Sequence, residues 1–115
     1  MVDIETVRKW ALAFDEVIEL PHFDRTSFRV NKKIFVTLDV KNNRAVLKLS
    51  ETDQSVFSAF DNSSIYPVPN KWGKHGATQV ELKKVRKDLF KDALTSAYCQ
   101  VAPGKLAEKY TLRRR

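Results

Sequence analysis

Three consecutive segments in which apolar and polar residues alternate constrain the fold of this chain more than any other feature. They span residues 28–30, 34–40 and 45–49. Successive side chains of an extended strand point to opposite faces, so a period of two predicts strands with one buried face. In the second segment this places Ile34, Val36, Leu38 and Val40 inward, with Phe35, Thr37 and Asp39 outward. In the third, Ala45, Leu47 and Leu49 alternate with Val46 and Lys48.

Two short turns join these segments. They are Asn31-Lys32 and Lys41-Asn42-Asn43-Arg44, and asparagine adopts the left-handed backbone conformation of tight turns more readily than most residues. Connections this short link antiparallel neighbours. The region 28–49 is therefore predicted to form three antiparallel strands in a row.

Two helices are predicted on either side of these strands. The first begins after Asp3, a suitable N-cap, and runs to about Phe14, with Ile4, Val7, Ala11 and Phe14 on one apolar face. A break at Pro21-His22-Phe23 separates this helix from the strands. Ser50 followed by Asp53 resembles a capping box and predicts a short helix that ends near Asp61-Asn62. Its inward residues are predicted to be Val56, Phe57 and Phe60.

The second half of the chain supplies two more strands and a long helix. Two prolines restrict residues 65–69 to a sheet edge or an irregular segment, and residues 78–82 alternate as a strand. Apolar pairs then recur at helical spacing from Leu89 to Val101, after a weak N-cap and before Pro103-Gly104. A further helical stretch is predicted over 105–112.

This order of elements predicts an α+β fold. It is a two-layer sandwich with a mostly antiparallel sheet, in the order helix, three strands, helix, two strands, helix. A length of 115 residues with 43% hydrophobic residues favours a single domain over 1–115, with a basic tail, 111–115, that is expected to fray.

Net charge, apolar runs and the cysteine count indicate which partners and which cell compartment to expect. The formal net charge is +7, and the excess lies entirely in residues 61–115, which hold twelve Lys and Arg against five Asp and Glu. Such asymmetry favours an anionic partner, nucleic acid before a membrane surface. No signal-like or membrane-spanning apolar run is found, and the single cysteine excludes an intrachain disulfide and a paired-thiolate zinc site. We expect a cytoplasmic protein with no membrane partner.

The stretch NKWGKHG, residues 70–76, is the first candidate site. It contains two of the three glycines of the chain, and it presents Lys71, Lys74 and His75 beside the ring of Trp72. The cations could contact phosphates while the ring stacks on a base or sugar. The alternative is that Trp72 folds back over the core and the glycines only supply positive φ for a turn.

A run of basic residues is the second candidate. It contains Lys83, Lys84, Arg86, Lys87 and Lys91. On a helix, Lys84, Lys87 and Lys91 would form one polar stripe that could follow a phosphate backbone. Because Asp88 and Asp92 interrupt it, the alternative is a solvated and partly ion-paired helix face.

Catalytic and metal-binding residues are not predicted. His22 and His75 lack metal-ligand spacing, and Cys99 lies among apolar helical residues. The acids Asp15, Glu16, Glu19 and Asp24 form a loose cluster that is too small for a metal site and suits a solvated helix end. No glycine-rich phosphate loop occurs. We therefore expect a non-enzymatic protein without cofactors or metal.

Four stretches give the chain a family resemblance. They are FRVNKKIFVTL (28–38), VLKLS (46–50), YPVPNKWGKHG (66–76) and SAYCQVAPGKLA (96–107). They resemble the MmcQ/YjbR-like family of small bacterial proteins over nearly the whole chain. The resemblance implies a compact fold like that of the bacterial frataxin homologue and of secretion chaperones, and it implies DNA binding.

The sequence therefore predicts a DNA-binding protein that acts mainly through phosphate contacts, with little base readout. The predicted contact residues are Lys71, Trp72, Lys74, His75, Lys83, Lys84 and Lys87. The alternative is a protein-protein interaction or adaptor module that binds no nucleic acid. A monomer or a weak dimer is expected.

Overall fold

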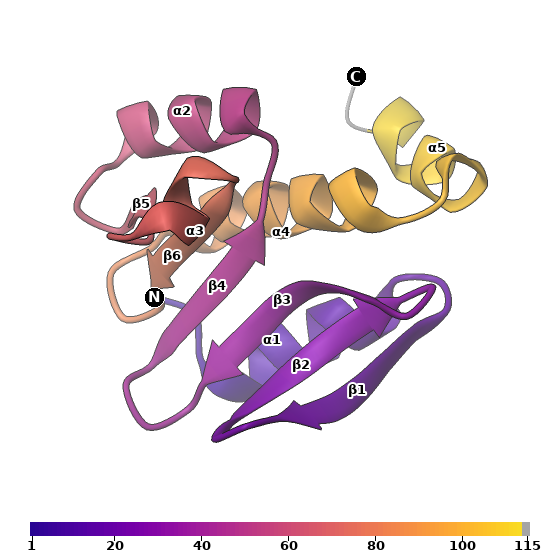
Figure 1. Cartoon of the computed structure of the whole chain (residues 1–115), viewed down its shortest axis with the longest axis horizontal. Helices are drawn as coiled ribbons and strands as arrows, with labels where there is room; N and C mark the ends of the chain where they lie inside the picture. Colours follow the sequence, from indigo (N-terminus) through magenta and orange to yellow (C-terminus); the bar gives the residue numbers. More distant parts are fainter. Residues whose placement is uncertain (114–115) are drawn as a thin grey trace.

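Five helices and six strands make up this protein in a computed structural model that describes the backbone of residues 1–113 and the side chains of residues 1–110 (Figure 1). The helices are α1 (Ile4–Ala13), α2 (Glu51–Phe60), α3 (Lys71–Lys74), α4 (Lys87–Val101) and α5 (Gly104–Arg113). The strands are β1 (Val17–His22), β2 (Arg25–Val30), β3 (Lys33–Asp39), β4 (Arg44–Lys48), β5 (Ile65–Pro67) and β6 (Ala77–Glu81).

The strands form one antiparallel sheet, which confirms the predicted α+β class. Their order is β1-β2-β3-β4-β6-β5, so the proline-containing segment 65–67 lies at an edge as predicted. The predicted break at 21–23 is wrong, because Pro21 and His22 belong to β1. A proline is tolerated there because β1 is the other edge strand, where an amide hydrogen need not pair on both sides.

The caps and turns follow the sequence closely. The side chain of Asp3 accepts a hydrogen bond from the Thr6 amide, and that of Ser50 accepts one from the Asp53 amide. Asn31, Lys32 and Asn43 adopt positive φ angles of 51°, 67° and 54° in the two predicted turns. The helix ends and the hairpins are therefore encoded locally.

A β-bulge in β3 changes which residues face the core. Phe28 pairs with Val36 and Arg29 with Ile34, so Phe35 is an extra residue between the two pairs. Phe35 turns inward against Phe14 and Tyr98, while Ile34 lines the opposite face of the sheet. The alternation had predicted the reverse for both residues, and it had placed the exposed Val40 inward as well.

Helices cover only one face of the sheet. In Figure 1, α1 and α4 lie behind the strands, and α2 flanks β5. Phe28, Val36, Leu38, Leu47 and Val80 point toward the helices and are fully buried with Phe90 and Tyr98. The face turned away from the helices has no element over it among the described residues, except where α3 rises at one end.

The short helix α2 turns a different face inward than predicted. Phe57 is buried, but Val56 and Phe60 are exposed, Phe60 at 68% of its surface. Gln54 is buried in their place. The side-chain amide of Gln54 donates hydrogen bonds to the Gly73 and Ala77 carbonyl groups. This polar contact requires α2 to turn Gln54 inward.

The C-terminal helix extends into the predicted tail. α5 includes residues 111–113, whereas residues 114 and 115 of the predicted frayed tail lie outside the described part. Among the described residues, no helix is both long enough and apolar enough to span a bilayer.

Candidate functional site

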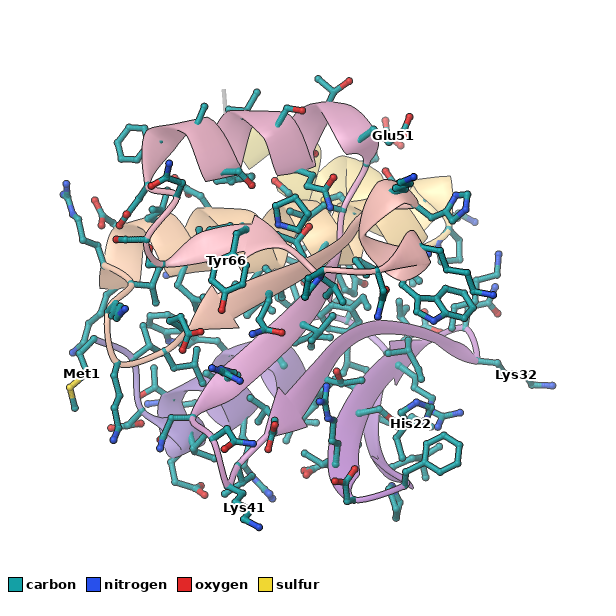
Figure 2. All side chains as sticks on the ribbon, turned by 60° about the vertical axis from the view of Figure 1, so that its left-hand side comes forward. Met1, His22, Lys32, Lys41, Glu51 and Tyr66 are labelled. Carbon is teal, nitrogen blue, oxygen red and sulfur yellow. The ribbon has the colours of Figure 1, made fainter. Side chains whose placement is uncertain are left out.

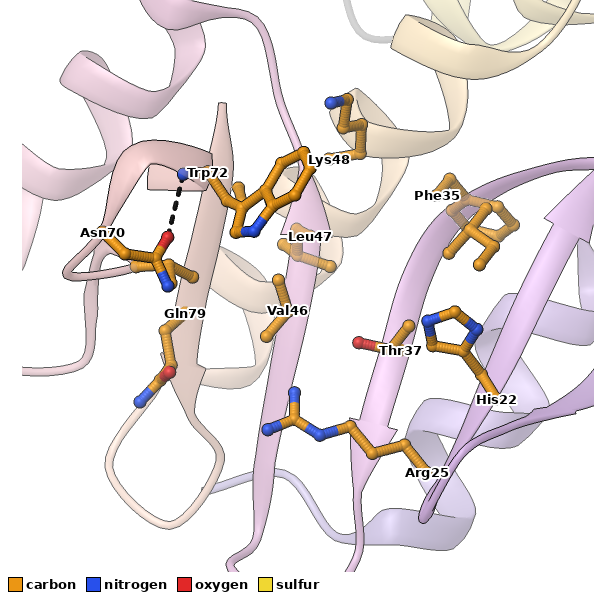
Figure 3. A pocket seen from close by; sticks show the side chains of 13 residues that line it. His22, Arg25, Phe35, Thr37, Val46, Leu47, Lys48, Asn70, Trp72 and Gln79 are labelled. Carbon is orange, nitrogen blue, oxygen red and sulfur yellow. Dashed lines mark hydrogen bonds between the residues drawn. The ribbon is translucent and has the colours of Figure 1, made fainter. Parts of the chain in front are cut away.

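A groove crosses the face of the sheet that the helices leave open. Its volume is about 560 Å³. Figure 3 shows Asn70 and Trp72 on one side, His22 and Arg25 on the other, and Thr37 and Val46 between them. The described lining residues are His22, Arg25, Ile34, Phe35, Thr37, Val46, Leu47, Lys48, Val68, Asn70, Trp72, Ala77 and Gln79, of which Phe35 and Leu47 have their side chains buried in the core.

The floor of the groove follows from strand register. Thr37 pairs with Val46, and Val46 pairs with Gln79, so the three side chains form one row across β3, β4 and β6. Directly opposed residues of an antiparallel sheet point to the same face. The row thus lies on the open face, with the core residues on the other.

Trp72 forms one wall of the groove and points away from the core. Its side chain is 60% exposed, so the alternative in which the ring folds back over the core is wrong. The Asn70 side chain caps α3 by accepting a hydrogen bond of 2.8 Å from the Trp72 amide. The ammonium of Lys71 lies 5.4 Å from the centre of the Trp72 ring. One aromatic face and one cation are therefore presented together.

Close backbone packing explains why glycines flank this segment. A Cβ atom at Gly73 would lie 1.9 Å from the carbonyl oxygen of Val68, and one at Gly76 would lie 1.9 Å from that of Leu49. Gly76 also has a φ of 99°. The glycines thus seat α3 against the sheet rather than make the loop flexible.

Gln54 holds α3 from the other side. Its amide nitrogen donates to the carbonyl oxygens of Gly73 and Ala77, at 2.8 and 3.1 Å. It also lies 3.2 Å from the Thr78 hydroxyl. Since Gln54 is only 8% exposed, these contacts form away from water and fix α3 relative to β6.

The β1–β2 hairpin forms the opposite wall. His22 and Arg25 pair across the hairpin, and Figure 2 shows His22 near its tip. Phe23, in the turn between them, is 93% exposed with a φ of 60°. The Arg25 guanidinium lies 3.7 Å from the Asp39 carboxylate, a partly exposed pair that leaves the cation available to a ligand.

The groove itself is positively charged. Lys48 and Arg25 line it, and Lys71 stands beside it on Trp72. No Asp or Glu is among the described lining residues, and Lys48 and Lys71 form no ion pair with a described carboxylate. Within the described lining, no carboxylate offsets the attraction of an anion.

Two acids beside the groove are already paired with cations, Asp39 with Arg25 and Glu81 with Arg44. Glu81 accepts hydrogen bonds from the Tyr66 hydroxyl and from Arg44, whose Nε lies 3.1 Å from a Glu81 oxygen. The Tyr66 bond and then Arg44 hold the pKa of Glu81 below its usual value. Gln79 in turn donates to the Tyr66 hydroxyl at 2.9 Å. This network closes the edge of the groove without adding net negative charge.

The predicted basic residues separate into two groups. Lys71, Lys74 and His75 lie on or just after α3, at the start of β6. Lys83, Lys84 and Lys87 follow the other end of that strand. The predicted helical stripe of Lys84, Lys87 and Lys91 is wrong, because α4 begins at Lys87 and Lys84 lies in the preceding turn.

Comparisons with known proteins agree with this fold. The family model described as YjbR matches residues 12–100. The chain belongs to the YjbR family. The crystal structure of Deinococcus radiodurans protein DR2400, described with the family-model domain DUF419, is similar with a TM-score of 0.76. The match covers 96% of this chain and 89% of that chain at 18% identity, which supports the fold alone. Among curated proteins, no sequence matches.

Several groove residues of this YjbR-family protein escaped the sequence prediction. They are His22, Arg25, Thr37, Lys48, Asn70 and Gln79. A signal for three of them was present, because Thr37, Lys48 and Gln79 occupy outward positions of alternating strands. His22 carried no such signal, since β1 was not predicted, and neither did Arg25, since the predicted strand began only at Phe28 whereas β2 begins at Arg25.

Neither the potential metal-ligating side chains nor Cys99 forms a second candidate site among the described residues. Within residues 1–110, no three His, Cys, Asp or Glu side chains gather as a metal would require. Glu19 binds Arg8 and Thr26, and Asp15 binds Lys109. The Cys99 thiol contacts the Ala107 carbonyl oxygen at 3.7 Å between α4 and α5, which indicates a packing role.

Proposed function

We propose that this YjbR-family protein is a non-enzymatic protein that binds nucleic acid, namely DNA, through the open face of its sheet. The observation that carries the proposal is the groove of about 560 Å³ in which an exposed tryptophan stands among cations, with no described acid in the lining. Cations contact phosphates, and an exposed ring stacks on bases.

Each wall has a distinct role in this proposal. Lys48 and Lys71 neutralise phosphates beside Trp72, and Arg25 does so at the opposite wall. Arginine suits this position because its planar guanidinium donates two parallel hydrogen bonds to a phosphate. The proposal moves the interface away from Lys83, Lys84 and Lys87, which lie beyond the far end of β6.

Two double variants of equal charge test the location. Lys48→Gln with Lys71→Gln removes cations at the groove, while Lys83→Gln with Lys84→Gln removes the same charge elsewhere. In anisotropy titrations with labelled DNA, we expect the groove variant to weaken binding. Its salt slope should fall by about 0.9 for each duplex phosphate that the protein no longer neutralises. The control variant should keep the slope of the original protein.

The same titration tests the function itself. Absence of binding to any DNA at micromolar protein and low salt would contradict the proposal. Equal losses in the two double variants would show a diffuse charge effect and would contradict the groove as the site.

Protein-protein docking is the second candidate function, and one observation favours it. Val56 and Phe60 lie one helical turn apart on the exposed side of α2, at 59% and 68% exposure. Adjacent exposed apolar side chains on a helix are typical of docking surfaces. A partner that protects α2 from hydrogen exchange, in a protein that binds no DNA, would favour this candidate.

A further inference from the structure

We propose that the groove binds a single strand of nucleic acid, with one unpaired base stacked on Trp72. This inference rests on the proposed function and specifies its ligand. It is carried by the aromatic wall, by the polar groups of the floor and by the size of the groove.

The aromatic wall favours an unpaired base. Trp72 is 60% exposed, and Lys71 covers one part of its ring at 5.4 Å. A stacking contact requires the flat face of a base, and within a duplex that face is covered by the neighbouring base pairs. Only an unstacked base can therefore use this ring.

The floor and the wall beside it offer hydrogen bonds of the kind that a free base edge requires. The Asn70 oxygen is taken by the Trp72 amide, which leaves its amide nitrogen to donate. The Gln79 nitrogen donates one of its two hydrogens to the Tyr66 hydroxyl, and its carbonyl oxygen can accept. The Thr37 hydroxyl, which lies across Val46 from Gln79, can do both. A duplex cannot use these groups fully, because its Watson–Crick edges are already paired.

The shape of the site also disfavours duplex recognition by α3. The four residues of α3 span about 6 Å at 1.5 Å per residue, which is too short to read a major groove as a recognition helix. A volume of about 560 Å³ falls within the range of small-ligand sites. It matches a nucleotide or two rather than a flat duplex surface.

Charge, together with the stacking face and the polar groups, favours nucleic acid over a peptide. Lys48 and Arg25 lie on different strands, so a phosphate backbone can cross the groove between them. An acidic peptide would satisfy the cations, but it would not use the stacking face together with the donor and acceptor pattern of the floor. The outcome with such a peptide is therefore part of the test.

Tryptophan fluorescence can follow this contact directly. The chain has two tryptophans, and Trp10→Phe leaves Trp72 as the reporter. The titrants are oligo-dT of about 12 nucleotides, within the site sizes of small single-strand-binding domains, and a mixed-sequence duplex of about 12 base pairs, with affinities compared per phosphate. We expect oligo-dT to quench Trp72 and to bind at least about tenfold more tightly than the duplex.

Matched variants separate stacking from general charge. We expect Trp72→Ala to weaken oligo-dT binding about 10- to 100-fold, and Trp72→Phe to retain most of the affinity. Phe60→Ala removes a similarly exposed ring on α2 and should change the binding of neither ligand. Circular dichroism checks that each variant is folded. If Trp72→Ala does not fold, Lys48→Gln provides a second variant that is expected to weaken oligo-dT binding.

The outcomes distinguish this inference from the proposed function. Duplex binding that equals oligo-dT binding, or oligo-dT binding without quenching of Trp72, would overturn the single-strand inference and leave the proposed function standing. Absence of binding to both nucleic acids would overturn both. Quenching by poly-glutamate but not by oligo-dT would identify an acidic peptide as the ligand and would also overturn the inference.

Discussion

At the scale of single residues, Gly76 gives the sharpest test of how the groove is built. Its φ is 99°, and a Cβ atom at this position would lie only 1.9 Å from the Leu49 carbonyl oxygen, so there is no room for a side chain. We expect Gly76→Ala to lower the free energy of unfolding by more than about 1 kcal/mol. Urea denaturation measures this change.

Gly104 supplies the matched control. It begins α5, and no atom lies within 4 Å of the position where its Cβ would be. Gly104→Ala is therefore expected to be neutral or to stabilise the protein by up to about 1 kcal/mol, because alanine loses less backbone entropy in a helix. Equal destabilisation by the two substitutions would contradict the role given to Gly76.

At the scale of secondary-structure elements, Gln54 couples α2 to α3. Gln54→Leu removes the hydrogen bonds to Gly73 and Ala77, so the buried Gly73 carbonyl loses this donor, while the partly buried Ala77 carbonyl still accepts from the Val68 amide. We expect a loss of about 1–3 kcal/mol in the free energy of unfolding. Hydrogen exchange should quicken most at residues 70–77, because α3 loses its anchor to the sheet.

The exposed Gln100 on α4 is the control for that substitution. Gln100→Leu removes the same amide at the surface and should change stability by no more than about 0.5 kcal/mol. If Gln54→Leu left the exchange of residues 70–77 unchanged, α3 would be held by its glycine contacts alone.

At the scale of the whole molecule, Tyr98 and Glu81 each contribute to the pH dependence of stability, beside other groups with shifted pKa values such as Asp39 and Tyr66. Burial, with Tyr110 nearby, raises the pKa of Tyr98 to about 12, and its hydroxyl donates to the Asp15 carbonyl oxygen. The unfolded chain loses this proton near pH 10, so stability falls as the pH rises from about 10 to 12. The pKa of Glu81 is lowered instead, so its contribution is lost as the pH falls below about 4.5.

Urea titrations across this pH range measure the predicted loss of stability at alkaline pH and at acid pH. Tyr98→Phe should reduce the alkaline loss and leave the acid limb in place. Glu81→Gln should reduce the acid loss, and it should also change the alkaline limb slightly because burial and then the hydrogen bond to Glu81 raise the pKa of Tyr66. An unchanged alkaline slope in Tyr98→Phe would show that Tyr98 is not the group responsible.

The sequence by itself determined most of the elements and their local chemistry. Alternation at 28–49 predicted β2, β3 and β4, and Asp3 and Ser50 predicted the two capped helices, because strand period and N-caps depend on neighbouring residues only. The segment 70–76 was also marked as unusual by its glycines and its tryptophan.

Only the tertiary structure decided which way side chains face and which of them meet. The bulge that turns Phe35 inward arises from pairing between β2 and β3, and the burial of Gln54 arises from α3, so neither is visible in local periodicity. His22, Lys48 and Trp72 lie on three separate elements, and the antiparallel order of the sheet brings them to one groove. The exposure of Trp72 follows from that arrangement, because the backbone contacts at Gly73 and Gly76 fix α3 with its ring over the open face.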